Sequence, residues 1–279
     1  MLTVLCVVLA TTPATAVTRY YDTELSYVHE DNLGRAAESQ DAVDDDLLLA
    51  RGSANWLVPL NATSGLLAAV AGEYQHLARW QDLSRGALSG QLSYRYKPAS
   101  AFNAPWFEAR VFGAIRQFQD STLRDGGRLE FDGAIGSTLS DAIEIRIAYR
   151  YSLERAWHEA VFDGDQHRLS GTLNWRVDRV IWYGTLGWQR GDTVSSAPDG
   201  ALLERTARAH AVDSALSDGG HPRVAYRLDA DTLTGMLGFN YPLARGLALD
   251  VAALYFDADS ETGAHYRGYR VTAGVLYRF

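Results

Sequence analysis

Cysteine and lysine are almost absent from the sequence. The one cysteine, Cys6, lies in an apolar stretch at the N-terminus, so the rest of the chain offers no disulfide, cysteine-based zinc cluster or catalytic thiol. The one lysine is Lys97, and arginine supplies every other permanently positive side chain. Basic residues number 26 against 34 acidic residues, a balance that excludes a nucleic-acid-binding protein with a basic face.

Long hydrophobic runs are also missing. Residues 1–16 form an uncharged apolar stretch, but it is shorter than the roughly 20 residues that a membrane-spanning helix needs. The stretch ends in Ala14-Thr15-Ala16, the small-residue pattern at which signal peptides are cleaved. We therefore expect a signal peptide at 1–16 and an exported domain at 17–279. A hydrophobic content of 47% with a mean hydropathy of −0.17 fits neither a disordered chain nor a helical membrane bundle.

Apolar and polar residues alternate along most of the exported domain. In the segment 143–152, Ile145 and Ile147 fall on one face of an extended chain, and Arg146 and Arg150 fall on the other. This period of two predicts β-strands and leaves at most minor helices. The pattern predicts twelve strands, at about 20–30, 46–59, 65–77, 84–97, 106–118, 127–139, 142–155, 166–177, 180–191, 223–241, 247–257 and 266–279.

The connections between these segments alternate in length. Turns of a few residues, as at 140–141 and 178–179, alternate with a set that includes the long acidic loops 31–45, 156–165 and 192–222. Short turns on one side and long loops on the other are typical of a transmembrane barrel. The predicted fold is a single all-β, antiparallel, up-and-down barrel of about twelve strands, with 10–14 strands compatible with the pattern. An even number places both termini on the periplasmic side.

The alternative is a soluble β-sandwich or lipocalin-like barrel with the apolar face turned inward. Three features disfavour it. The polar face carries many small residues, most segments are long enough for a tilted crossing of about 9–11 residues, and aromatic residues gather near strand ends. The aromatic residues at the long-loop ends are Tyr27, Tyr74, Tyr149, Tyr151, Trp188, Tyr255 and Tyr269.

With this signal peptide, strand pattern and last strand, the chain resembles bacterial outer-membrane β-barrel proteins. The last segment, 271–279, has apolar residues at alternate positions, including Tyr277, and ends in Phe279. A strand of this kind is similar to the signal that the barrel-assembly machinery recognises. The resemblance covers about residues 20–279, implies a location in the outer membrane among lipid and lipopolysaccharide, and specifies no function.

If the apolar face meets lipid, the charged face lines the interior. Rings of arginine favour anions, so we expect an arginine-lined pore for small anionic or hydroxyl-rich solutes. The alternative is a closed network of arginine–carboxylate pairs that fills the lumen. Three consecutive strands (106–118, 127–139 and 142–155) carry the densest set of inward charges, which could form a cross-strand ladder. The candidate lumen residues are Glu108, Arg110, Arg116, Arg128, Glu130, Asp132, Glu144, Arg146, Arg150, Arg168 and Arg270.

The sequence leaves three functional classes open. A porin-like channel is the main interpretation, and an export or surface-assembly barrel with a separate periplasmic partner is the alternative. A barrel hydrolase would need an ordered nucleophile and base, but no such motif is present, and only Asp163, Asp165 and His167 suggest an acid–histidine site, with Asp192 or His221. We therefore expect no enzyme activity.

The seven histidines all map to the long-loop side or its border, without the fixed spacing of a metal site. We expect no metal and no cofactor. The longest loop, 192–222, has no strand pattern and a basic centre at Arg205 and Arg208. Loops of this length usually have a function, so we expect this one to fold into the pore or contact a ligand, with small residues that permit a short helix.

Overall fold

The structure is a computed structural model of the 279-residue chain, and it describes residues 17–198, 207–217 and 222–279. The expected signal peptide, 1–16, lies outside the described residues. The described strands are β1 (Thr18–Glu30), β2 (Asp45–Asn61), β3 (Ser64–Leu77), β4 (Arg85–Tyr96), β5 (Trp106–Phe118), β6 (Gly126–Ser140), β7 (Ile143–Ala156), β8 (Gly164–Val177), β9 (Val180–Pro198), β10 (Ala209–Val212), β11 (Arg223–Ala244), β12 (Leu247–Ser260) and β13 (His265–Arg278).

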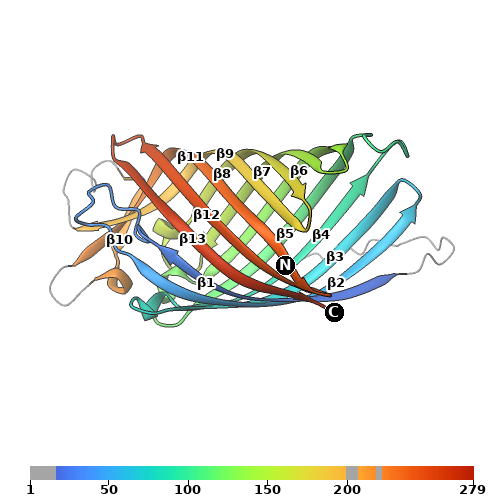
Figure 1. Cartoon of the computed structure of the whole chain (residues 1–279). Helices are drawn as coiled ribbons and strands as arrows, with labels where there is room; N and C mark the ends of the chain where they lie inside the picture. The colour runs from blue at the N-terminus through green and yellow to red at the C-terminus, as the bar shows by residue number, and fades with distance from the viewer. Residues whose placement is uncertain (1–16, 199–206, 218–221) are drawn as a thin grey trace, which may run out of the picture.

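All strands except the short β10 form the wall of a closed barrel (Figure 1). Consecutive wall strands pair antiparallel, β9 pairs with β11, and β13 pairs with β1 to close the ring. The start of β1 and the end of β13 lie together, because Asp22 is opposite Arg278. The predicted up-and-down barrel of twelve strands, with the start of β1 and the end of β13 on the short-turn side, is therefore confirmed.

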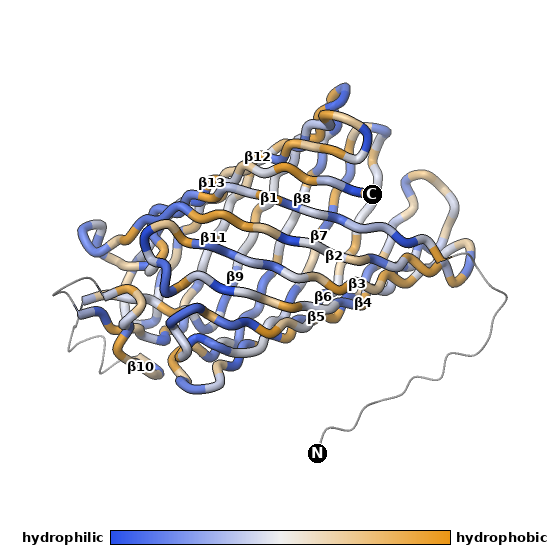
Figure 2. The backbone as a smooth tube through the Cα atoms, turned by 90° about the horizontal axis from the view of Figure 1, so that it is seen from below, coloured by the Kyte–Doolittle hydropathy of each residue, from blue (hydrophilic) through white to orange (hydrophobic). Residues whose placement is uncertain are grey.

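The alternation in the sequence explains the wall. Along β7, Ile147 and Tyr149 are about half exposed on the outer surface, whereas Ala148 and Ser152 are buried on the inner one. Figure 2 shows the same alternation of apolar and polar positions along the other strands. The predicted strands correspond one to one with the wall strands, and most ends differ by only a few residues.

Helical structure in the described residues is limited to four 3-10 turns in the extracellular connections. They are η1 (Gln81–Leu83), η2 (Thr122–Arg124), η3 (Ala160–Phe162) and η4 (Ser214–Leu216). Within the described residues, no helix is long and apolar enough to span a membrane. The expectation of at most minor helices is confirmed.

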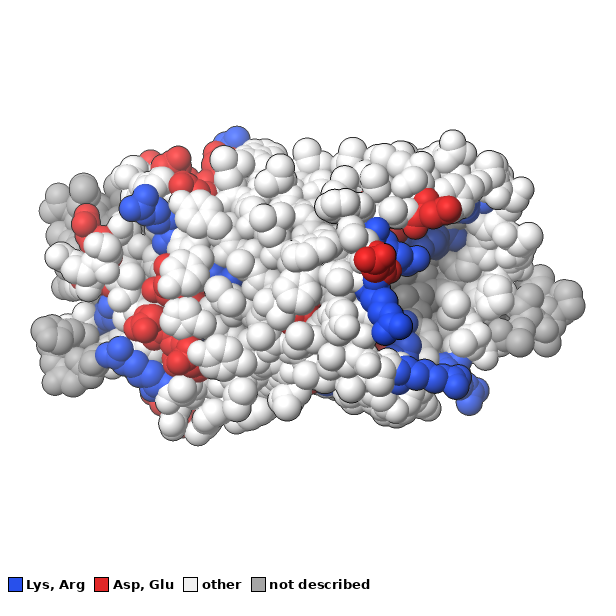
Figure 3. All heavy atoms as spheres, viewed as in Figure 1, with Lys and Arg blue, Asp and Glu red and all other residues white. Residues whose placement is uncertain are grey.

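The outer surface has an apolar middle. Figure 3 shows charged atoms near the two ends of the barrel, separated by a broad uncharged band. Leucines of this band are strongly exposed, with Leu186 at 75% and Leu237 at 73%. Such a band with aromatic residues at its borders matches the hydrocarbon layer and its interfaces.

The expectation that 192–222 has no strand structure is wrong. β9 continues to Pro198 and pairs there with the first part of β11, beyond the ends of β8 and β12. β10 then pairs with the same part of β11. The two long strands thus form an extension above the barrel wall, and Gly191, with φ of +131°, lies where β9 passes β8.

Candidate functional site

The register places all of the candidate lumen residues on the inner face of the wall. Glu108, Arg110, Arg116 and their neighbours occupy alternate positions of β5–β7, with Arg168 on β8 and Arg270 on β13. Their role in function remains a prediction. Their contacts divide them into a central ladder of arginines and carboxylates, several ion pairs beside it, and residues such as Arg168 that form no ion pair with a described residue.

The ladder is centred on two buried carboxylates of β6. The side chains of Glu130 and Asp132 are 6% and 3% exposed. Arg110 donates to Asp132 from both Nε (3.1 Å) and Nη2 (2.8 Å), and Arg150 Nε donates to the other oxygen of Asp132 at 2.8 Å. Arg128 Nη2 lies 2.6 Å from Glu130. The predicted cross-strand ladder on β5–β7 is therefore present. Its arginines supply the charged hydrogen-bond donors that buried carboxylates require.

Further ion pairs flank the ladder. Glu108 lies between Arg95 (3.3 Å) and Arg146 (3.6 Å), towards the periplasmic ends of their strands. At the other, extracellular ends of β5 and β7, Arg116 pairs with Glu154. On the far wall, Arg270 Nη2 donates to Glu30 at 2.5 Å, and Glu144 has no ion pair in the part of the chain described here. Most arginines of the lumen are thus partly neutralised.

Arg168 is the exception among these candidates. Its guanidinium donates to the hydroxyl of Thr234 at 3.3 Å and forms no ion pair with any described residue. Arg168 reaches β11 by passing over Gly187 of β9, where a Cβ atom would lie 2.6 Å from the Thr234 hydroxyl and 3.2 Å from an Arg168 nitrogen. A glycine is therefore needed at this crossing.

The periplasmic half of the lumen contains a cavity of about 490 Å³. Arg51, Asn55, Asn240 and Arg278 line it, together with Asp22, which accepts hydrogen bonds from Arg278. Figure 3 shows a hollow lined by charged atoms close to the C-terminus marked in Figure 1. A polar cavity of this size accommodates water and small polar solutes.

The extracellular mouth differs, because a segment of the chain lies across it. This crossing segment consists of β10 and η4, residues 209–217. η4 contacts η1, although six wall strands (β4–β9) separate the two connections in one direction and six in the other. Ala215 and Leu216 pack against Leu83 of η1 and against the inward side chains of Val28 and Leu47. The crossing segment therefore packs against the inner wall on the opposite side of the barrel.

Polar contacts fix the crossing segment and the extension to the other extracellular connections. Arg124 Nη2 of η2 donates to the buried Asp213 at 2.5 Å. Arg223 donates to the backbone oxygen of Asp41 at 2.7 Å, and Arg227 donates to that of Ala160 at 2.8 Å. The mouth thus contains a small apolar core of its own, with polar groups around it.

Arg208 joins the extension to the last extracellular turn. It lies 2.9 Å from Asp192, 2.6 Å from Asp229 and 3.4 Å from Glu261. Burial alone would lower the pKa of Arg208, but the charges of Asp229, Asp192 and Glu261 outweigh that effect and raise the pKa above its usual value. Arg205, the other arginine of the basic centre expected in the loop 192–222, lies outside the described residues.

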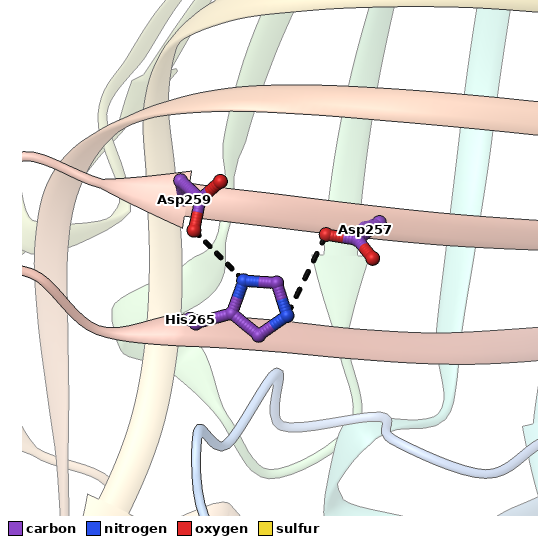
Figure 4. Close-up of side chains that lie close together, drawn as sticks. All are labelled: Asp257, Asp259 and His265. Carbon is purple, nitrogen blue, oxygen red and sulfur yellow. Dashed lines mark hydrogen bonds and ion pairs between the residues drawn. The ribbon is translucent and has the colours of Figure 1, made fainter.

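Histidines lie with aspartates at the extracellular border of the outer surface. His265 lies between two carboxylates of β12, with Nδ1 2.8 Å from Asp259 and Nε2 3.6 Å from Asp257 (Figure 4). Tyr255 donates to Asp257 at 3.2 Å. The imidazole therefore bridges the two carboxylates.

The residues considered for a hydrolase are not brought together. Asp165 accepts a hydrogen bond from a tyrosine of β7, and His167 lies 2.6 Å from the hydroxyl of another. Asp163 accepts a backbone N–H, and Asp192 pairs with an arginine. His221 lies outside the described residues. Among the described residues, these side chains form no nucleophile–base pair.

Sequence reasoning missed the small apolar core at the mouth. Ala215 and Leu216 belong to no periodic segment, so only their burial (5% and 2% exposed) reveals their role. The available signal was the apolar inward positions Val28, Leu47 and Leu77 near the extracellular ends of β1–β3. Apolar residues on a face that is otherwise polar indicate that something covers them.

No protein-family model and no curated protein sequence matches the chain. Among solved structures, an outer membrane channel from Pseudomonas putida F1 is similar, with a TM-score of 0.60 and 10% identity over 94% of this chain and 95% of that one. The NanC porin has a TM-score of 0.48 with 10% identity over 92% and 98% of the two chains. The KdgM porin in complex with disordered oligogalacturonate has a TM-score of 0.46 with 14% identity over 92% and 99%.

Because the sequence identity is only 10%, the similarity to the Pseudomonas putida channel shows the fold alone. The chain has the β-barrel fold of that outer-membrane channel, and the exposed apolar band on its outer surface suits contact with a lipid bilayer.

Proposed function

We propose that the barrel is a channel for small anionic or hydroxyl-bearing solutes, and that the crossing segment closes it at the extracellular mouth. The observation that carries the proposal is the arginine-rich inner wall. The ladder and its neighbour Arg168 contain four arginines (Arg110, Arg128, Arg150 and Arg168) against the two carboxylates Glu130 and Asp132. This surplus of positive charge attracts anions into the lumen.

The crossing segment supports a gated channel. Leu216 and Ala215 exclude water where they pack across the mouth, whereas the periplasmic cavity is polar. Displacement of η4 would expose a few apolar side chains, and no wall hydrogen bonds would break. The channel therefore opens through a local movement at the mouth while the wall keeps its shape.

Single-channel recording tests this function. The purified protein is inserted in a planar bilayer, and its Leu216→Asp variant is measured beside it under a salt gradient. A buried aspartate in the apolar core of the mouth disfavours the closed arrangement. We expect longer or more frequent openings in the variant, with a reversal potential that shows anion preference. A folded variant without any conductance would show a filled lumen.

The structure also favours a substitution over a deletion as the test of what the loop 192–222 does. Deletion of residues 194–219 would remove the end of β9, residues 194–198, which pairs with the first part of β11, and would therefore disturb the extension. Substitution at Leu216 leaves both strands intact.

The proposed function as an outer-membrane channel also implies partners for the barrel. We propose that the barrel-assembly machinery recognises Tyr277 and Phe279, which follow one another on the outer surface with ring centroids 5.4 Å apart. Lipopolysaccharide would contact the tyrosine and aspartate side chains at the extracellular border, such as Tyr27, whose hydroxyl donates to Asp46 at 2.6 Å.

A further inference from the structure

Two arginines face each other on neighbouring strands inside the lumen. Arg150 of β7 and Arg168 of β8 are directly opposite in the antiparallel register. Side chains at such positions have Cβ atoms about 4.5–5.5 Å apart, and like charges there repel one another. Arg150 is compensated on its other side by Asp132, at 2.8 Å. Arg168 has no carboxylate partner among the described residues.

The surroundings of Arg168 increase the imbalance. The charged groups that act on it are Arg150, Arg128 and Glu130, of which two are positive. Glu130 already pairs with Arg128 at 2.6 Å and lies within 3.6 Å of Arg150. Arg168 is also half-buried, so water screens its charge less than at the open surface. An arginine held in this way retains unused N–H donors and a net positive field.

The wall holds the guanidinium in place. Arg168 extends over Gly187 and donates to Thr234, so its direction is fixed by a hydroxyl on a third strand. The Thr234 hydroxyl in turn donates to the backbone oxygen of Gly187 at 3.3 Å. A fixed guanidinium without a carboxylate partner can bind an oxyanion through its parallel N–H donors.

We infer that Arg168, on the strand beside Arg150, forms an anion-binding site in the lumen, which takes a carboxylate or another oxyanion of the transported solute. The inference rests on the proposed channel function and adds a discrete, saturable site to it. The bound anion supplies the negative charge that Arg168 lacks, and Thr234 positions Arg168 for it.

The first test is direct binding, because it does not depend on the channel being open. Crystals of the full exported protein are soaked in selenate, and the anomalous difference density is measured. Density beside the Arg168 guanidinium group is the expected result, and its absence in Arg168→Gln crystals would confirm the assignment. Wild-type crystals with no density there would overturn the inference.

The second test is block of the current. Chloride current through the Leu216→Asp channel is measured while succinate is added, and we expect saturable block. Adding Arg168→Gln should raise the half-blocking concentration at least tenfold, and Gly187→Ala should raise it several-fold because its Cβ displaces Arg168. Arg168→Lys keeps the charge without the planar fork and should restore the block only in part.

A matched control is available on the next strand. Arg190 of β9 faces outward and is exposed, so Arg190→Gln removes the same charge and should leave succinate block unchanged. An anion-selective current whose block does not respond to Arg168→Gln would overturn the site and leave the channel function intact. A folded Leu216→Asp barrel that conducts nothing, or selects cations, would contradict the channel function instead, and the selenate crystals would still decide the site.

Discussion

Leu216 and Leu83 lie in one buried apolar core, although the two residues belong to connections on opposite sides of the barrel ring. This core spans the extracellular mouth and joins η4 to η1. The apolar inward positions of β1–β3 complete the same small core. Hydrophobic packing therefore holds the crossing segment across the mouth, and single substitutions can weaken it.

The first prediction concerns this contact. Leu216→Asp should increase the open probability of the channel, because the closed arrangement would bury a carboxylate without a partner. Val212→Asp is the matched control, since Val212 belongs to the same crossing segment but is 64% exposed. Single-channel recording of both variants checks the prediction, and equal open probabilities would show that η4 does not control the mouth.

A covalent link should have the opposite effect. Cys6 is the one cysteine of the chain and residues 17–279 have none, so Leu83→Cys combined with Leu216→Cys introduces the only thiols in that range. A bifunctional thiol reagent with a short, cleavable spacer should hold η4 against η1 and reduce conductance, and cleavage of the spacer should restore it. Conductance that is indifferent to the link would place the path of solutes elsewhere.

The ladder should contribute to both stability and selectivity. Asp132→Asn leaves two inward arginines with one carboxylate fewer, so we expect a loss of about 1–3 kcal/mol in the free energy of unfolding. The anion preference should rise at the same time. Urea unfolding in detergent and the reversal potential measure the two effects.

Glu144→Gln is the control for this substitution. Glu144 also faces the lumen and carries the same charge, but it forms no ion pair within the described strands. Its loss should change the free energy of unfolding by less than about 0.5 kcal/mol. Equal destabilisation by both variants would mean that the ladder geometry does not matter.

Assembly in cells should depend on the last residue. Phe279 stacks on Tyr21 with ring centroids 5.6 Å apart and is 60% exposed. If the assembly machinery recognises it, Phe279→Ala should lower the heat-modifiable, folded fraction in outer membranes and leave refolding of purified protein into vesicles nearly unchanged. Phe107→Ala, at another exposed aromatic position, should alter neither. A parallel loss in vesicles would assign Phe279 a role in stability only.

Much of the wall could be predicted from the sequence, because strand periodicity is a local property. Ile145 and Arg146 differ in hydropathy, and that difference alone assigns them to opposite faces of β7. The parity of each strand then identifies the inward charges. The sequence alone could not predict the individual ion pairs of Glu130 and Asp132. The register between β5, β6 and β7 decides which arginine lies next to which carboxylate.

The crossing segment could not be predicted in the same way. Val194–Pro198 of β9 contains small and polar residues, and its strand structure depends on pairing with β11. The burial of Leu216 depends on residues more than 130 positions earlier in the chain, such as Leu83. Such long-range contacts have no local sequence period, which is why the loop 192–222 was expected to lack strands.

The central claim is that the lumen conducts anions once the mouth is open. The most direct measurement is the reversal potential of the Leu216→Asp channel in a planar bilayer under a tenfold gradient of potassium chloride. The account predicts a reversal potential displaced toward the chloride equilibrium potential, and a smaller displacement when Arg168→Gln is added. A displacement toward the potassium equilibrium potential, or no conductance from protein shown to be folded, would contradict it.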